Sequence, residues 1–133
     1  MQPDDRRAEA LRRMLIEQRQ AVQREIDESL QRYRMGQERM RDESVPDPED
    51  SSLRSSMGDE RLALLESKNR TRDQFDEALR RLDAGAYGIC EECGGPIGDA
   101  RLNALPFARR CIACQEKLEA LEQVERKEER EDI

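Results

Sequence analysis

The sequence predicts a mainly α-helical protein: a long antiparallel coiled-coil hairpin, a small four-cysteine zinc-finger module and a C-terminal helix. Three observations support this. The composition, 41% charged and only 3% aromatic, is typical of long solvated helices with a narrow apolar seam. A proline-rich break divides the first part of the chain, and all four cysteines lie close together in the second. We therefore expect a hairpin over residues 1–83 with an acidic tip at 44–52, and a zinc finger plus C-terminal helix over 84–133.

The first helix is expected from about Asp5 to Glu43. No proline interrupts this stretch, and Pro3 followed by two carboxylates suits a helix start. Apolar residues recur at gaps of three, four and seven, which places them on one face of a helix. A helix this long needs a partner for that face. The predicted seam comprises Leu11, Leu15, Val22, Ile26, Leu30, Tyr33 and Met40.

The segment from Ser44 to Ser52 is expected to be a turn. Pro46 and Pro48 lack backbone N–H groups, and each biases the preceding residue toward an extended conformation. Carboxylates are concentrated around these prolines, so the turn is also acidic.

The second helix is expected from about Gly58 to Leu82. Because the connection is short, the two helices would pack antiparallel as a hairpin. Packing of each helix against another chain is the alternative. The predicted seam of the second helix comprises Leu62, Leu65, Phe75, Leu79 and Leu82.

The cysteines form two pairs, Cys90-x-x-Cys93 and Cys111-x-x-Cys114, with seventeen residues between them. This spacing is typical of a structural zinc site, in which two turns each supply two thiolates to a tetrahedral metal. The chain contains no histidine, so cysteines alone must supply any four-ligand Cys/His set. Four thiolates leave no position for a water molecule, and we therefore expect one structural zinc ion rather than a catalytic one.

Disulfides, a redox-active pair and an iron site are the alternatives for these cysteines. The N-terminal sequence MQPDDRRAEA lacks the apolar region of a secretory signal, which favours a reducing compartment. A redox C-x-x-C normally starts a helix in a strand–helix unit, and no such pattern is visible.

The zinc module is expected to begin after Gly85, a candidate left-handed cap for the second helix. Gly94, Gly95 and Pro96 would form the turn of the first knuckle. The apolar residues of this region make too small a core to fold without metal. They are Tyr87, Ile89, Ile97, Leu102, Leu105 and Phe107.

The C-terminal helix is expected from Gln115 to about Arg130. Leu118, Leu121 and Val124 lie on one side of it, and we expect this side to pack against the base of the hairpin.

Charge and hydropathy argue against two classes of function, nucleic-acid binding and membrane spanning. The net charge of −7 disfavours non-specific binding to nucleic acid phosphates. Between Cys90 and Cys114 three acids balance three arginines, so the module lacks the basic surface of a nucleic-acid-binding finger. Arg109 and Arg110 are interpreted as solvated surface or as a contact for an acidic partner. No apolar run is long enough to span a membrane, and we expect a soluble, cytoplasmic protein.

Two tip acids, Asp47 and Asp50, have two interpretations. Asp is common in turns for conformational reasons. Alternatively, a rigid arm could carry these carboxylates into a partner, where they would bind a hard metal ion or pair with arginines. A paired-carboxylate hydrolase would need a shaped pocket, which a two-helix tip does not provide.

The stretch GAYGICEECGGPIGDARLNALPFARRCIACQ resembles the zinc-finger signature of the DksA/TraR family: G-x-Y-G-x-C-x-x-C-G-x-x-I, then R-L-x-A-x-P, then C-x-x-C. The preceding helix, P-D-P-x-D turn and second helix resemble its longer, DksA-like members, so the resemblance covers residues 30–120. It implies a non-enzymatic regulator that binds RNA polymerase rather than DNA and inserts its arm into the secondary channel.

The resemblance also assigns roles to single residues. The tip motif D-x-x-D-x-A of the family falls on Asp47, Asp50 and Ser52, with serine in place of alanine. Basic residues that bind the alarmone ppGpp in DksA-like members are replaced here by Ser67, Gln74 and Gln115. None of these supplies a positive charge, so ppGpp binding at that site is expected to be weak or absent.

The resulting hypothesis is a monomeric, cytoplasmic RNA polymerase-binding regulator of transcription that is independent of ppGpp at the DksA-type site. The alternative is a zinc-stapled coiled-coil adaptor that binds another protein. A thiol redox protein is a more remote third.

Overall fold

The computed structural model describes residues 3–42 and 48–131, and the side chains within 5–38 and 57–130. The described residues form four helices: α1 (Pro3–Asp42), α2 (Pro48–Asp83), α3 (Asp99–Ala104) and α4 (Ile112–Glu131). Between α2 and α3 there is one isolated antiparallel bridge, from Ile89 to Pro96. The fold is mainly helical, as predicted. Contacts divide the chain into two compact units, Arg13–Glu77 and a second unit made of Met1–Arg12 with Ala78–Ile133.

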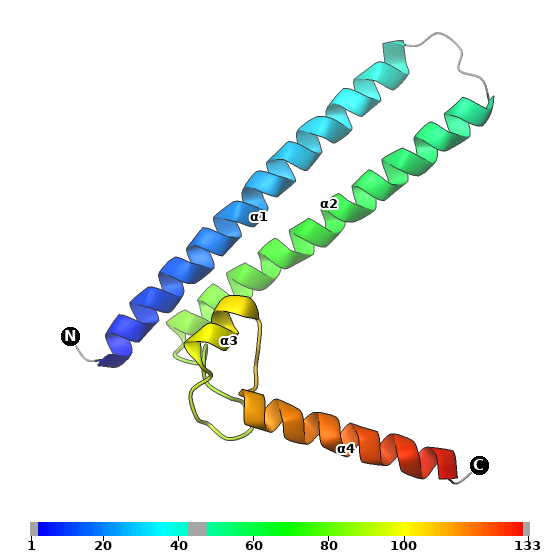
Figure 1. Cartoon of the computed structure of the whole chain (residues 1–133). Helices are drawn as coiled ribbons and strands as arrows, with labels where there is room; N and C mark the ends of the chain where they lie inside the picture. Colours follow the sequence, from blue (N-terminus) through cyan, green and yellow to red (C-terminus); the bar gives the residue numbers. More distant parts are fainter. Residues whose placement is uncertain (1–2, 43–47, 132–133) are drawn as a thin grey trace. The chain divides into compact units, whose positions relative to one another are not determined.

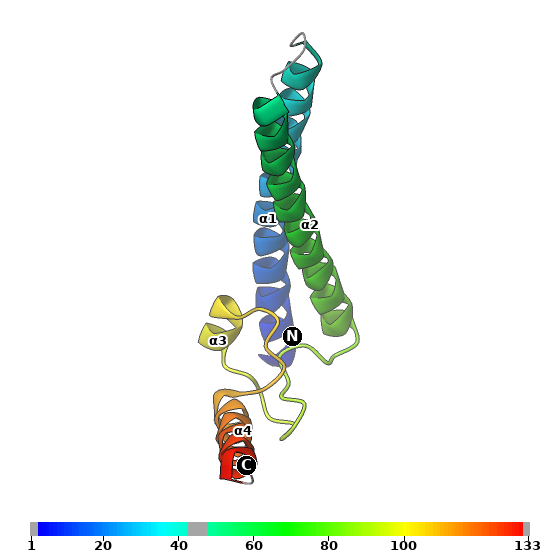
Figure 2. The ribbon, with the colours of Figure 1, turned by 90° about the vertical axis from the view of Figure 1, so that its right-hand side faces the viewer.

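The unit Arg13–Glu77 is an antiparallel helical hairpin, in which α1 and α2 lie side by side (Figures 1 and 2). Leu15, Ile26 and Phe75 are buried, as expected for seam residues. Leu62 was also predicted to lie in the buried seam, but its side chain is on the surface, with 40% of the residue exposed.

Polar contacts also join the two helices of this hairpin. Lys68 Nζ donates to Ser29 Oγ at 3.1 Å. One helical turn further along α2, Arg72 Nη1 donates to Gln23 Oε1 at 3.4 Å. The two cations that interrupt the apolar seam of α2 therefore have partners on α1, and these pairs help to set the register of the helices.

The start of the second helix was predicted ten residues too late. Helix α2 begins at Pro48, not near Gly58. Proline suits the first turn of a helix, because its fixed φ is helical and its missing N–H would be unpaired there. Carboxylates next to Pro48 in the sequence also suit a helix start, because the N-terminal end of the helix dipole is positive. Of the predicted turn, residues 44–47 lie outside the described residues, and residues 48–52 are helical.

The second unit contains the ends of both long helices and the cysteine-bearing module. Arg12 and Asp83 form an ion pair between α1 and α2. Gly85 has φ +77° and its N–H donates to Leu82 O at 3.1 Å, which confirms the predicted left-handed cap. The buried apolar residues of this unit are Leu11, Ala78, Leu82, Tyr87, Cys90, Ile97 and Leu102.

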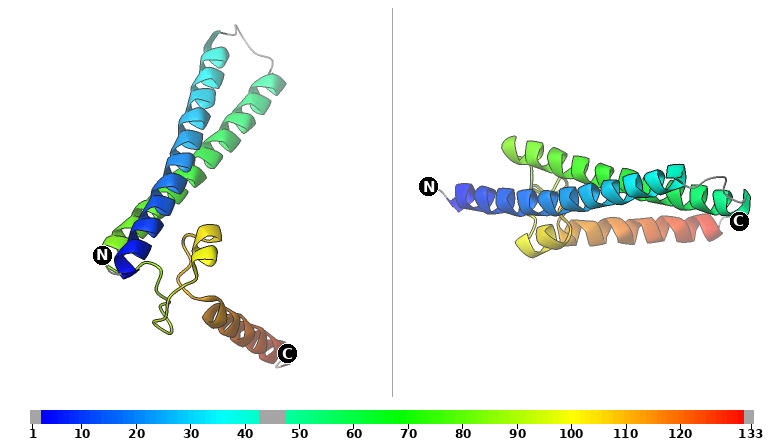
Figure 3. Two further views of the ribbon diagram at one scale, coloured as in Figure 1. Left: turned by 60° about the vertical axis from the view of Figure 1, so that its left-hand side comes forward. Right: turned by 90° about the horizontal axis from the view of Figure 1, so that it is seen from above.

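Two predicted core residues of the module are on its surface: Ile89 is 41% exposed and Leu105 is 52% exposed. Helix α3 was not predicted. It is only six residues long, too short for a periodic pattern, and it carries the fully buried Leu102. Figure 3 shows α3 joined to α4 by a short loop.

The C-terminal helix starts earlier than expected, at Ile112 rather than Gln115, so Cys114 belongs to its first turn. The prediction that its apolar side packs against the hairpin base is wrong for two of three residues. Leu121 is 61% exposed and Val124 is 52% exposed. Among the described residues, no helix combines the length and the hydropathy needed to cross a membrane.

Candidate metal centre

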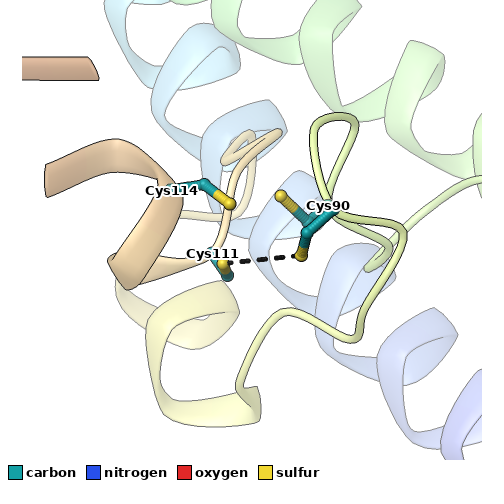
Figure 4. Close-up of side chains that lie close together, drawn as sticks. Cys90, Cys111 and Cys114 are labelled. Atoms are coloured by element: carbon teal, nitrogen blue, oxygen red, sulfur yellow. Dashed lines mark hydrogen bonds between the residues drawn. The ribbon is translucent and has the colours of Figure 1, made fainter. Parts of the chain in front are cut away.

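The four cysteine sulfurs come together in one cluster, with all ligand atoms of Cys90, Cys93, Cys111 and Cys114 within 4.8 Å of one another. Cys93 Sγ and Cys111 Sγ are 3.9 Å apart. A tetrahedral zinc ion with Zn–S bonds of about 2.3 Å separates its sulfurs by about 3.8 Å, so this spacing fits zinc. All four cysteines are free thiols. In Figure 4, the side chains of Cys90, Cys111 and Cys114 converge from the loop and from the start of α4.

The first knuckle is a tight backbone loop around Cys90. Gly94 N–H donates to Cys90 O at 3.0 Å, and Cys90 N–H donates to Gly95 O at 2.8 Å. Gly95 N–H also lies 3.4 Å from Cys93 Sγ. The predicted Gly94-Gly95-Pro96 turn is thus present, and it directs two sulfurs to the same side.

The second knuckle is held by contacts from three separate parts of the module. Glu91 N–H donates to Arg109 O at 2.9 Å. Arg101 Nε, on α3, donates to Arg110 O at 3.0 Å. Tyr87 Oη donates to Pro106 O at 2.8 Å. These three bonds place the loop before Cys111 against the first knuckle.

The thiols of the cluster differ in proton affinity. Hydrogen bonds from the backbone N–H groups of Cys93 and Cys111 lower the pKa of the Cys90 thiol to about 6. Hydrogen bonds with the side chains of Cys111 and Cys90 raise the pKa of the Cys114 thiol to about 12. Because zinc binds thiolates, its binding displaces protons from this cluster, and the affinity falls as the pH falls.

The module is anchored to the start of α1 by Arg7. Arg7 Nη2 donates to Ile97 O at 2.5 Å, and Arg7 Nε donates to Asp99 Oδ1 at 3.3 Å. This residue lies more than eighty positions away from its partners. No local pattern in the sequence singled it out.

The predicted tip residues are only partly covered. Asp47 lies outside the described residues, whereas Asp50 and Ser52 lie in the first turns of α2. Their part in binding a partner stays a prediction.

Comparison with known proteins identifies the family. Residues 85–120 match the family described as "Prokaryotic dksA/traR C4-type zinc finger". The chain is 33% identical over 126 residues to a Caulobacter vibrioides protein named "RNA polymerase-binding transcription factor DksA", covering 92% of this chain and 83% of that protein. This chain belongs to the DksA/TraR family. The Escherichia coli K12 protein of the same name is 32% identical over 111 residues, covering 78% of this chain and 66% of that protein.

A solved structure of a DksA protein has the same fold. Transcription factor DksA2 from Pseudomonas aeruginosa matches with a TM-score of 0.76 and 34% identity, over 90% of this chain and 88% of that structure. The curated DksA relatives are named as transcription factors rather than as enzymes. Membership of a C4-type zinc-finger family and the clustered sulfurs establish zinc as the cofactor, in a structural role.

Proposed function

We propose that this DksA/TraR protein binds RNA polymerase and regulates transcription by inserting its helical hairpin into the secondary channel of the enzyme. The observation that carries the proposal is the helical hairpin joined to a four-cysteine module, which matches DksA2 over most of both chains. RNA polymerase is proposed as the partner because the curated relatives are named RNA polymerase-binding transcription factors.

In this proposal the two parts of the chain have different tasks. Residues 1–83 form the arm and residues 84–133 form the zinc module, in which Cys90, Cys93, Cys111 and Cys114 bind the metal. Asp47, Asp50 and Ser52 act at the tip of the arm, near the catalytic centre of the polymerase. The protein acts as a cytoplasmic monomer and makes no sequence-specific contact with DNA.

The experiment is transcription in vitro with purified polymerase, with and without this protein. We expect the wild-type chain to alter initiation. Asp47→Asn/Asp50→Asn should still bind polymerase but lose most of this effect, because two carboxylates are neutralised at the tip. The matched control, Asp59→Asn/Glu60→Gln, removes two exposed charges further along α2 and should act like the wild type. Bound polymerase with unchanged transcription would instead favour the adaptor hypothesis.

Independence from ppGpp belongs to the same proposal. The positions assigned by family resemblance to alarmone binding hold Ser67, Gln74 and Gln115, and Gln115 Nε2 donates to Glu119 Oε1 at 3.2 Å. Neutral side chains offer a polyphosphate no ionic contact. We therefore expect added ppGpp to leave the effect of the wild-type chain unchanged. Tight, salt-resistant ppGpp binding that is lost on changing Ser67 or Gln74 would contradict this.

A further inference from the structure

An ionic contact joins the two cysteine knuckles. Glu91 and Glu92 lie between the cysteines of the first pair, and Arg110 directly precedes Cys111 of the second. Arg110 Nη2 lies 3.0 Å from Glu91 Oε1, and Arg110 Nε lies 3.7 Å from Glu92 Oε1. One guanidinium group thus pairs with both carboxylates across the module.

We propose that Arg110 is a positioning residue that clasps the two knuckles and slows the release of zinc. It does not ligate the metal. Zinc leaves a closed four-thiolate shell only after one knuckle moves away from the other, and the ion pairs of Arg110 oppose that movement. This inference concerns metal retention and does not depend on the proposed role at RNA polymerase.

The backbone of the second knuckle does not need the Arg110 side chain for its position. Glu91 N–H binds Arg109 O, and Arg101 Nε binds Arg110 O. Both bonds use carbonyl groups, so they survive replacement of the Arg110 side chain. A substitution there can therefore remove the clasp while leaving the loop in place.

The guanidinium is the most sheltered member of its two ion pairs. The Arg110 side chain is 29% exposed, that of Glu91 is 37% exposed and that of Glu92 is 60% exposed. Arg110 Nε is buried and has no hydrogen-bond partner. Within the described part of the chain, it is the one buried side-chain nitrogen or oxygen in this situation. The Glu92 carboxylate, 3.7 Å away, compensates this nitrogen through its charge rather than through a hydrogen bond.

The charge balance of the module also favours this role. A zinc ion with four thiolates has a net charge of −2, and Glu91 and Glu92 add two more negative charges beside it. Arg110 compensates part of this charge. Without it, the carboxylates of the first knuckle and the thiolates of the second lack this compensation, and their repulsion favours opening.

The test is the rate of zinc release from the full-length zinc-loaded protein into an excess of a metal-sensitive chelating dye. Arg110→Met should accelerate release about fivefold at low salt, the size expected for a partly sheltered ion pair. Arg110→Lys should restore part of the retention. Because screening weakens ion pairs, the difference from the wild type should shrink as salt is raised.

Arg109→Met is the matched control, because Arg109 is exposed and forms no ion pair within the described residues. It should release zinc at the wild-type rate. Charge reversal is the stricter test: Glu91→Arg and Arg110→Glu should each accelerate release, and the double variant should release zinc more slowly than either. Helical circular dichroism and the cobalt–thiolate absorption of each variant verify that the site is assembled.

Three results would overturn the proposal: release from Arg110→Met at the wild-type rate, equal acceleration by Arg109→Met, or strictly additive effects in the charge-reversed pair. If Arg110→Met fails to assemble the site, Arg110→Lys and the reversed pair still decide the question.

Discussion

Arg19 on α1 and Asp76 on α2 pair across the helical hairpin, with Arg19 Nε 2.5 Å from Asp76 Oδ1. Each side chain is one-third exposed, so the pair is partly sheltered from water. The hydrogen bond to Asp76 raises the pKa of Arg19, which keeps its charge at all working pH values. Like the hydrogen bonds of Arg72 and Lys68, this contact joins α1 to α2 through polar side chains. Together these contacts help to fix the register in which the helices pack.

The Arg19–Asp76 pair should stabilise the hairpin measurably. We expect Arg19→Met to lower the free energy of unfolding by about 1–2 kcal/mol, because it leaves a half-buried carboxylate without its partner. Urea denaturation followed by circular dichroism measures this. Arg24→Met is the control, since Arg24 is exposed on the same helix. Equal midpoints for the two variants would show that the pair contributes nothing.

Gly88 should not tolerate a side chain. Its φ is +79°, and an added Cβ would lie 3.3 Å from Arg7 Nη2 and 3.4 Å from Leu102 Cδ1. We expect Gly88→Ala to destabilise the zinc module by about 1–3 kcal/mol through backbone strain and crowding. Gly98→Ala is the matched control, because Gly98 has φ −60° and nothing within 4 Å of the added atom. Thermal unfolding should separate the two, and an unaffected Gly88→Ala protein would contradict the packing described for this loop.

Tyr87 should make the stability of the module sensitive to alkaline pH. Burial raises the pKa of Tyr87 to about 12, from the ordinary value of 10.0. Because the folded state binds the proton more tightly, this contribution is complete below pH 10 and is lost as the pH rises toward 12.

The variant Tyr87→Phe should remove that alkaline dependence. It should also cost about 1 kcal/mol at neutral pH, because the hydroxyl no longer donates to Pro106 O. Denaturant titrations between pH 8 and about 11.5 measure both effects. Parallel pH profiles for the two proteins would refute the assignment.

Removal of zinc should affect the two compact units unequally. We expect the module, whose apolar core is small, to depend on its metal, whereas the unit Arg13–Glu77 has its own buried residues and inter-helix hydrogen bonds. After chelation, we expect amide hydrogens around Cys90 and Cys111 to exchange rapidly, while those near Phe75 and Ile26 stay protected.

Cys114→Ser should reproduce the effect of chelation on hydrogen exchange, because it removes one of the four clustered thiols. Adding zinc back should restore protection in the wild type only. Parallel loss of protection in both units would mean that the hairpin has no stability of its own.

Much of the fold and the site could be predicted because the relevant signals are local. The spacing of the cysteine pairs predicted the sulfur cluster, and gaps of three, four and seven predicted the long helices. Helix ends were harder to predict. Pro48 breaks a helix in its interior and starts one at its first turn, so its presence alone did not decide between the two. The short α3 carries too few residues for any period to be detected.

By itself, the amino-acid sequence determined the helical class, the pairing of the clustered cysteines and the left-handed cap at Gly85, since each depends on residues a few positions apart. Only the tertiary structure decided which distant groups meet: Arg7 with Ile97, Tyr87 with Pro106, and Arg110 with Glu91. It also left Leu121 and Val124 exposed, although their spacing matches that of a buried seam. The physical reason is that periodicity states which face of a helix is apolar, whereas burial and pairing depend on what the folded chain brings against that face.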